Sequence, residues 1–427
     1  MSKHSTKTQS TQDLHLAHSA IVEVPLPMLS ALEDIESAFF GVCIEAGKHV
    51  LSAMMEHDRT ALCGLPWKPD EERGGRRAGS TEGPITLGGR RIAIRRPRVR
   101  SIDGDELSLP SFDAATDRDP LDRQTLAAMA AGVPTRRYGP SLDPLPPTET
   151  ERSTSKSAVS RRFVALTEQK LGDWLSQPLD ELDLKIVMLD GIYFRDHCIL
   201  VALGVDSDGK KHPLGIREGN TENSAVARAL LSDLVERGLR TDRAIVFVID
   251  GSKALRQAIE KTFGSLALVQ RCAVHKRRNV LGHLPQSERG SVKRALDEAW
   301  NSDDPKRAKR LLENLARSLE SQHPGAAASL REGLDDTLTL LRLGVRGTLF
   351  QSIRSTNAIE SLNDKIAAYT RRVKRWSGGK MMLRWVGAAI LDAREGMRGV
   401  RGLKDMTILC NALERHEKTL HSRSEAA

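Results

Sequence analysis

Cysteines are few in this sequence, and long apolar runs are missing from it. The five cysteines among 427 residues are scattered, odd in number and without a CxxC pair, which argues against a disulfide framework and a zinc finger. No apolar run approaches the roughly 20 residues of a membrane span. The polar start at residues 1–7 also lacks the apolar segment of a signal peptide. We therefore expect a protein of the reducing cytoplasm without a membrane partner.

Acidic residues are outnumbered by basic ones, and the basic residues are clustered. Lys and Arg total 65 against 56 Asp and Glu, a formal net charge of +9 that favours a polyanionic partner but also suits many soluble proteins. Residues 89–100 carry six Arg and no acidic residue. The candidate phosphate contacts there are Arg95, Arg96, Arg98 and Arg100. Each phosphate that such a side chain neutralises steepens the salt dependence of the binding constant by about one unit of slope on a log–log scale. The alternative is a solvated strand face.

The N-terminal part is predicted to be mainly helical, with one hairpin. The polar residues 1–20 indicate a disordered tail, and apolar positions recur at helical spacing over residues 29–57. Two alternating runs around Gly88 and Gly89 predict a β-hairpin whose second strand leads into the Arg cluster. A helical pattern follows at residues 121–131. We interpret residues 21–150 as an N-terminal DNA-binding region.

Residues 151–180 contain a further candidate for DNA recognition. A helix is predicted over residues 155–171, with hydroxyl residues able to cap its start. Lys156, Arg161 and Arg162 would be available on its surface, as a major-groove recognition helix needs. A plain linker helix remains the alternative, because the connection from the preceding helix is longer than a helix-turn-helix turn.

From residue 184 the pattern becomes α/β. Strands predicted at residues 184–194, 198–205 and 211–216 would form a consecutive antiparallel sheet. A helix at 224–238 leads to a strand at 244–249, followed by a helix at 252–263 and a strand at 267–269. This core occupies residues 184–280. Leucine stripes at helical spacing predict a helical insertion domain at 281–350, and residues 351–427 complete the chain as basic helices.

Three carboxylates stand where a two-metal nuclease site would need them. Asp190 and Asp250 lie at or near the tips of probable buried strands, and Glu360 opens a probable helix. Carboxylates held on rigid elements can bind two divalent ions about 3.5 to 4 Å apart, an arrangement that serves phosphoryl transfer. Each has a simpler interpretation: an Asp before Gly is commonly a turn residue, and Asn357 with Glu360 forms a potential capping box.

Two basic runs are expected beside these carboxylates. The candidate DNA contacts in them are Arg271, Cys272, His275, Lys276, Arg371, Arg372, Lys374 and Arg375. The CxxH spacing of Cys272 and His275 suggests metal ligands, but two ligands do not make the four of a structural zinc site. A structural or DNA-contacting role is favoured for this pair. Trp300 could stack on an unpaired base, although a packed helix residue is the commoner case.

At these residues the sequence resembles the Mutator-type transposases of bacterial insertion sequences. The similar segments include Leu189-Asp-Gly-Ile, residues 202–210, residues 218–223, residues 248–255, residues 269–276 and Arg384-Trp385, in the right order from about residue 135 to near the C-terminus. The resemblance implies a ribonuclease H-like mixed sheet with a helical insertion between the second Asp and the Glu. It also implies that Asp190, Asp250 and Glu360 form a catalytic triad.

The resemblance carries further expectations. It implies two Mg²⁺ ions, with Mn²⁺ as a substitute, and double-stranded DNA, both transposon ends and target, as the partner of a homodimer or higher oligomer in the bacterial cytoplasm. One departure concerns Ala367, where relatives often carry a basic residue; Lys365, Arg371 or Arg372 could replace its phosphate contact. The rival interpretations are a catalytically silent transposon-derived DNA-binding protein and a structure-specific nuclease on the same fold.

Overall fold

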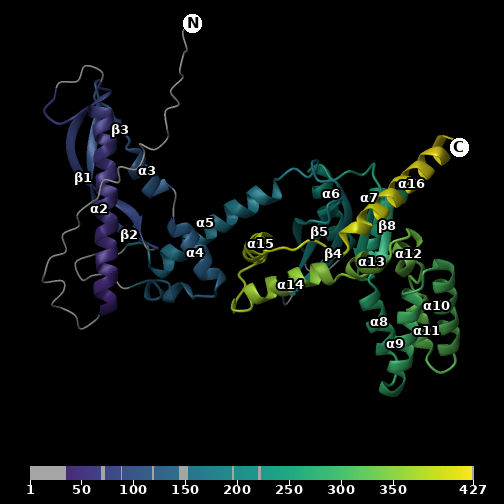
Figure 1. Cartoon of the computed structure of the whole chain (residues 1–427). Helices are drawn as coiled ribbons and strands as arrows, with labels where there is room; N and C mark the ends of the chain where they lie inside the picture. The colour runs from purple at the N-terminus through teal and green to yellow at the C-terminus, as the bar shows by residue number, and fades with distance from the viewer. Residues whose placement is uncertain are drawn as a thin grey trace, which may run out of the picture. The chain divides into compact units, whose positions relative to one another are not determined.

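A computed structural model describes residues 35–68, 73–87, 89–117, 120–143, 152–194, 197–219 and 223–425. Two compact units divide the chain, at residues 1–163 and 164–427, and each is described by itself (Figure 1). The predicted tail at residues 1–20 and the first part of the predicted helix at 29–57 lie outside the described residues. Within the described part of the chain, no helix is long and apolar enough to cross a membrane.

The first unit consists of a hairpin sheet and short helices around one long helix. Its elements are α2 (Ile35–Cys63), β1 (Gly75–Leu87), β2 (Arg90–Ser101), β3 (Glu106–Leu107), α3 (Pro110–Asp117), α4 (Pro120–Ala130), η1 (Thr135–Arg137) and η2 (Gly139–Ser141). Strands β1 and β2 pair antiparallel, which confirms the predicted hairpin. Gly89 in its turn has φ of +76°, a conformation that favours glycine. Its carbonyl accepts a hydrogen bond from the Tyr138 hydroxyl at 2.9 Å.

One face of this hairpin is buried and the other carries charge. Met55 of α2 packs against Ile85, Ile92 and Ile94 of the two strands, and all four side chains are buried. Because side chains alternate across a strand, the residues between these isoleucines lie on the opposite face. The Arg cluster therefore begins on a strand whose inner face is part of a hydrophobic core.

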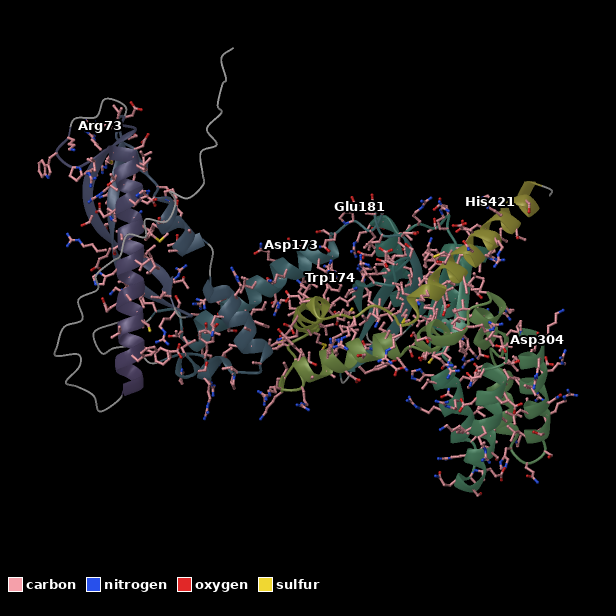
Figure 2. The ribbon with its side chains drawn as sticks, viewed as in Figure 1. Arg73, Asp173, Trp174, Glu181, Asp304 and His421 are labelled. Carbon is pink, nitrogen blue, oxygen red and sulfur yellow. The ribbon has the colours of Figure 1, made fainter. Side chains whose placement is uncertain are left out.

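Helix α5 (Lys156–Leu175) contains the boundary between the two units. It matches the helix predicted at residues 155–171 and extends one turn further. Ser155 caps it, because the Ala158 backbone N–H donates to Ser155 Oγ at 3.3 Å. Near its other end, Trp174, labelled in Figure 2, is buried and donates from Nε1 to the Pro213 carbonyl at 3.1 Å, which fixes this end of the helix to β6 (Lys211–Gly219).

The second unit is built on a five-stranded mixed sheet. Its strands are β4 (Leu184–Phe194), β5 (His197–Asp206), β6 (Lys211–Gly219), β7 (Ile245–Ile249) and β8 (Ala267–Arg271), in the order β6-β5-β4-β7-β8. The first three strands pair antiparallel, while β4 with β7 and β7 with β8 pair parallel. The predicted α/β pattern of strands is thereby confirmed.

Helices cover both faces of this sheet. On one face, α6 (Ser224–Glu236) and α7 (Lys253–Phe263) share a core with Val187 and Phe247. On the other face, α14 (Asn357–Thr370) and α15 (Gly379–Glu395) share a core with Met188 and Val248. Neighbouring residues of one strand thus face different layers, as the alternation of a pleated strand requires.

Between β8 and α14 the chain is mostly helical. These elements are α8 (Ala273–Gly282), α9 (Gln286–Trp300), α10 (Pro305–Leu319), α11 (Pro324–Arg331), η4 (Asp335–Leu338), α12 (Thr339–Arg342) and α13 (Gly347–Ile353). Helices α8 to α11 gather side by side (Figure 1). Asp304, labelled in Figure 2, caps α10 by accepting from the Lys306 N–H at 2.8 Å. The short η3 (Gly264–Leu266) precedes β8, and η5 (Leu403–Asp405) and α16 (Met406–Glu425) follow α15.

The leucine stripes of this segment are observed with one correction. The stripe at residues 308–319 forms α10, with Ala308 and Leu312 fully buried. The stripe at residues 334–341 is divided between η4 and the short α12 instead of forming one regular helix. Trp300 is 1% exposed and donates from Nε1 to Thr337 Oγ1 at 3.2 Å, so it is a packed core residue and is not placed to stack on a base.

Candidate active site

Three side chains lie in a row where the parallel strands end. Met188 of β4 pairs with Val248 of β7, which pairs with Gln270 of β8. Two residues further along each strand come Asp190, Asp250 and Cys272, at the same level of the sheet. The Cys272 N–H donates to the Ile249 carbonyl at 2.8 Å, so the chain after β8 still follows β7. By strand alternation, the row faces the layer that contains α14.

The two aspartates of this row differ in their local backbone. Asp190 lies inside β4, opposite Val201 of β5, so the turn interpretation is wrong for this residue. Asp250 directly follows β7 and does accept a turn-type hydrogen bond, from the Ser252 N–H to Oδ1 at 2.9 Å. Both aspartates are half-buried. Each residue therefore keeps part of its surface open to solvent.

Gly251 makes close packing possible beside Asp250. Its φ is +115°, and a Cβ added there would lie 2.4 Å from Nε of Arg271. No side chain fits in that space without displacing the guanidinium. Because Gly251 has no side chain, the Arg271 guanidinium can pack directly against the backbone of the turn that follows Asp250.

Glu360 reaches this row from helix α14. The helix begins at Asn357, its N-cap residue is Thr356, and no side-chain capping bond is present there, so the capping-box interpretation is wrong. Instead, the Thr356 hydroxyl donates to Glu360 Oε1 at 2.5 Å. Thr356 is fully buried, whereas the Glu360 side chain is 32% exposed. A buried hydroxyl therefore orients a carboxylate that remains open to solvent.

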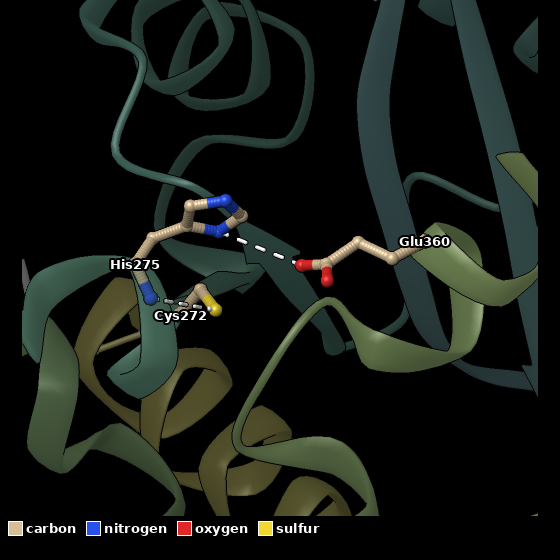
Figure 3. Close-up of side chains that lie close together, drawn as sticks. All are labelled: Cys272, His275 and Glu360. Atoms are coloured by element: carbon tan, nitrogen blue, oxygen red, sulfur yellow. Dashed lines mark hydrogen bonds and ion pairs between the residues drawn. The ribbon is translucent and has the colours of Figure 1, made fainter. Parts of the chain in front are cut away.

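Cys272 and His275 surround the same hydroxyl. Thr356 Oγ1 lies 3.3 Å from Cys272 Sγ and 3.2 Å from His275 Nδ1. His275 Nδ1 also lies 3.7 Å from Glu360 Oε1, the ion pair drawn in Figure 3. The hydroxyl has one proton, which the short bond to Glu360 uses. Cys272 Sγ accepts hydrogen bonds from the backbone N–H groups of His275 and Thr356, at 3.5 and 3.4 Å, and the Thr356 hydroxyl also lies against it.

The protonation of this cluster follows from the same contacts. The hydrogen bond with Cys272 raises the pKa of His275 against the effect of its burial, and the charges of Glu360 and Asp250 raise it further. Burial opposes ionisation of the Cys272 thiol, but hydrogen bonds from His275 and Thr356 outweigh burial and lower its pKa. The raised pKa favours the cationic form of His275, whose charge would partly balance the negative charge of Glu360 and Asp250.

Helix α14 is joined to strand β4 by a hydrogen bond between side chains. Asn363 Nδ2 donates to Asp190 Oδ2 at 2.7 Å, across 173 positions of sequence. Asn363 stands one helical turn after Glu360, on the same side of the helix. Buried Ile359, Leu362 and Ile366 anchor the adjoining face of α14 in the core. Asp190 and Glu360 are thus connected through a single packed helix.

The donor set fits a hard divalent cation. Asp190, Asp250 and Glu360 offer carboxylate oxygens from two adjacent strands and one helix, and oxygen is the ligand that Mg²⁺ prefers. Among the described residues, the one set of three or more His, Cys, Asp or Glu side chains whose ligand atoms all lie within 4.8 Å of one another is Cys272, His275 and Glu360. That second set would suit softer ions, but Cys272 is fully buried and its sulfur already contacts Thr356.

Three predicted DNA contacts near the site are buried and serve internal roles. Arg271 is 7% exposed and donates to the carbonyl and carboxylate of Glu332. Lys276 is fully buried and donates to the carbonyls of Ser329 and Glu332, while burial lowers its pKa to about 8. Cys272 has no exposed surface. These three side chains are not placed to contact DNA; Arg271 and Lys276 fasten the helical insertion near the end of β8, and Cys272 contacts Thr356.

The basic run after α14 is exposed, as a DNA contact requires. Arg371, Arg372, Lys374 and Arg375 are all exposed in the segment between α14 and α15. The next residue, Trp376, packs edge-on against Phe194 of β4, with ring centroids 5.2 Å apart. The basic segment is therefore attached to the strand that carries Asp190.

Of the DNA contacts predicted on the hairpin of the first unit, two arginines form ion pairs within the protein and two are exposed. Arg96 and Arg98 form ion pairs with Glu106 at 2.9 and 2.6 Å, and Arg96 also stacks on the Phe112 ring. Arg95 and Arg100 are exposed, although Arg95 Nε donates to Ser80 Oγ at 2.7 Å.

The candidate recognition helix shows the same division. Lys156 and Arg161 are exposed on α5. Arg162 is half-buried and donates to Thr125 Oγ1 at 3.3 Å and to the Ser153 carbonyl at 3.4 Å. Arg162 therefore holds the start of α5 against α4, which leaves Lys156 and Arg161 as the exposed candidates.

Sequence reasoning missed two residues that hydrogen-bond to the candidate carboxylates, Thr356 and Asn363. Both stand at helical spacing from Glu360, four residues before it and three after it, and this spacing was the available signal. Their importance depends on partners in β4 and α8, which sequence patterns do not reveal.

The fold and the site together define a mixed α/β protein in which two aspartates stand at one level of the central parallel strands. The sequence matches the family model described as "Transposase, Mutator family" over residues 29–398. The chain therefore belongs to the Mutator family of transposases.

Individual relatives agree with this family. The chain is 26% identical over 383 residues to the transposase for insertion sequence element IS256 in transposon Tn4001 of Staphylococcus aureus, covering 85% of this chain and 94% of that protein. It is 25% identical over 356 residues to the IS905 transposase of Lactococcus lactis subsp. lactis, covering 81% and 86%. It is also 31% identical over 177 residues to the IST2 transposase of Acidithiobacillus ferrooxidans, covering 42% and 58%.

Proposed function

We propose that this chain is an active transposase that cuts and joins DNA at a centre formed by Asp190, Asp250 and Glu360. The observation that supports the proposal is the placement of these side chains on neighbouring packed elements, with hydrogen bonds that orient Asp190 and Glu360. The register of β4 and β7 puts the two aspartates at one level, and α14 brings Glu360 to the same layer through Asn363 and Thr356. Three oxygen-donor side chains on packed elements form a suitable binding site for divalent ions.

The proposed chemistry is a two-metal phosphoryl transfer on a ribonuclease H-like core. The strand order β6-β5-β4-β7-β8, with three antiparallel strands followed by two parallel ones, supports this fold assignment. Two Mg²⁺ ions, or Mn²⁺ in their place, would activate a water or 3′-hydroxyl nucleophile and stabilise the leaving 3′-oxygen. In this scheme the carboxylates are metal ligands, and no side chain acts as general base.

The residues around the centre hold this arrangement. Thr356 orients Glu360, and Asn363 orients Asp190. His275, whose pKa is raised by Cys272 and by the nearby carboxylates, balances charge beside Glu360. The roles of Thr356, Asn363 and His275 follow from contacts within the protein.

DNA binding is assigned to exposed basic side chains in both units. In the first unit Arg95, Arg100, Lys156 and Arg161 would bind the terminal inverted repeats of the element. In the second unit, residues 371–375 would contact phosphates near the carboxylates, because Trp376 attaches this segment to β4. A homodimer or higher oligomer on DNA would allow two transposon ends to be cut and joined to one target.

A cleavage assay tests this proposal against its two rivals. The full chain is incubated with DNA carrying the ends of its element, with Mg²⁺ or with a chelator, and both cleavage and joining products are resolved. A transposase cuts at the ends and joins them to target DNA only with the ion. A silent DNA-binding protein shifts the same DNA without cutting it, and a structure-specific nuclease cuts branched DNA without preferring the ends.

A further inference from the structure

The Asn363 side chain occupies a position that the proposed triad does not explain. Its carboxamide reaches from α14 to β4, where Nδ2 donates to Asp190 Oδ2 at 2.7 Å. A carboxylate oxygen can only accept, so the amide nitrogen must face Asp190 and the orientation of the carboxamide is fixed by chemistry. Oδ1 branches from the same carbon as Nδ2 and therefore lies within a few ångström of the Asp190 carboxylate.

Oδ1 of Asn363 has no donor among the described residues. It is buried, and within the described part of the chain no group donates a hydrogen bond to it. Buried acceptors of this kind are rare in folded proteins, and leaving one unsatisfied costs about 1 to 3 kcal/mol. An oxygen without a donor, beside a carboxylate and one helical turn from Glu360, is the kind of atom that a bound cation satisfies.

The neighbouring helix positions show that this placement is specific to Asn363. Ser361 and Asp364 are exposed, and Leu362 is buried in the apolar core. In the helical turn that follows Glu360, the polar side chain that contacts β4 is that of Asn363. Side-chain amide oxygens belong to the oxygen ligands of hard divalent cations.

We propose that Asn363 belongs to the divalent-cation site: Nδ2 orients Asp190, and Oδ1 supplies a further oxygen ligand to the ion. This inference rests on the proposed function, because it places Asn363 in the same centre as the three carboxylates. Asn363 is then a positioning residue for Asp190 and a ligand through its second atom. The two roles explain why an amide, with one donor end and one acceptor end, stands here.

Binding of Mn²⁺ to the full chain, followed by the electron paramagnetic resonance signal of the free ion, tests the inference without cleavage. Asn363→Ala should weaken Mn²⁺ affinity by roughly 10-fold to 100-fold, the range for partners of metal ligands. Ser361→Ala is the matched control on the same helix and should bind as wild type does. Thermal unfolding without metal verifies that both variants fold. Unchanged affinity in a folded Asn363→Ala protein would overturn the inference.

Asn363→Asp separates the ligand role from the positioning role. It keeps an oxygen donor and adds negative charge, but it loses the donor to Asp190. If Oδ1 is a ligand, this variant binds Mn²⁺ more tightly than Asn363→Ala. Binding by Asn363→Asp that is no tighter than binding by Asn363→Ala, despite the added negative charge, would refute the ligand role.

Asp190→Asn distinguishes failure of this inference from failure of the proposed function. Loss of Mn²⁺ binding in Asp190→Asn together with wild-type binding in Asn363→Ala would remove Asn363 alone from the site. Wild-type binding in Asp190→Asn would contradict the cation site itself. High Mn²⁺ should also restore cleavage in Asn363→Ala, which a purely structural defect would not allow.

Discussion

Replacing Thr356 with valine should slow DNA cleavage without unfolding the protein. Valine has the shape of threonine but no hydroxyl, so the change removes the hydrogen bond to Glu360 Oε1 and leaves the packing of this fully buried position almost unchanged. Glu360 then loses the contact that fixes its orientation. His275 and Cys272 lose their shared neighbour as well.

The expected loss can be worked out from the exposure of the two partners. A hydrogen bond to a charged group contributes about 1.5 to 3 kcal/mol. Water can replace part of it, because the Glu360 side chain is 32% exposed, so the lower end of that range applies. If this energy holds Glu360 in its reactive orientation, about 1.4 kcal/mol corresponds to a tenfold slower reaction.

Single-turnover cleavage of end DNA, measured over a series of Mg²⁺ concentrations, gives the rate and its metal dependence. Thr356→Ser keeps the hydroxyl and should restore most of the activity. Thr370→Val is the matched control: Thr370 is also buried in α14, but its hydroxyl donates to the Ile366 carbonyl. Equal cleavage by Thr356→Val and Thr370→Val, with the same Mg²⁺ dependence, would refute the role of Thr356.

Three further predictions follow from other parts of the molecule. Residues 1–175 expressed alone should prefer element ends over random DNA in gel shifts and show no nuclease activity; equal binding to both DNAs would place specificity elsewhere. Ala367→Arg, on an exposed position two turns beyond Glu360, should steepen the salt dependence of DNA binding by roughly one ion; an unchanged slope would mean that this face does not meet DNA. Lys276 has a folded pKa of about 8 against 10.5 as its ordinary value, so the unfolded chain binds more protons between these values. The stability of wild type relative to Lys276→Met should therefore rise as pH increases from about 8 to 10.5, as measured by urea unfolding, and a constant difference would contradict the lowered pKa.

Much of the second unit could be predicted from local patterns. The apolar runs that form β4 and β7 and the helical stripe of α10 are continuous in sequence, and their periodicity reports burial directly. The extent of helix α14 was also predictable, because no Pro or Gly interrupts residues 357–370. The break between η4 and α12 was not predicted, since apolar spacing alone does not distinguish one helix from two short ones.

The candidate site shows where sequence patterns stop being informative. Arg271 and Lys276 belong to a basic run, and a charge pattern alone favours a solvated or DNA-contacting surface. Their burial depends on Glu332, about 60 residues away, whose carbonyl accepts from both side chains. Asn363 likewise acquires its role from Asp190, 173 positions earlier. Such pairings are set by the tertiary fold, so local sequence could not indicate them.

The most direct test of the central claim compares cleavage and binding on the same end DNA for Asp190→Asn, Asp250→Asn and Glu360→Gln. Each change removes one negative charge at nearly constant shape. If the three carboxylates form the cation site of a transposase, every variant loses Mg²⁺-dependent cleavage and still shifts the DNA in a gel as wild type does. Cleavage that survives in any folded variant would remove that residue from the site and contradict the account.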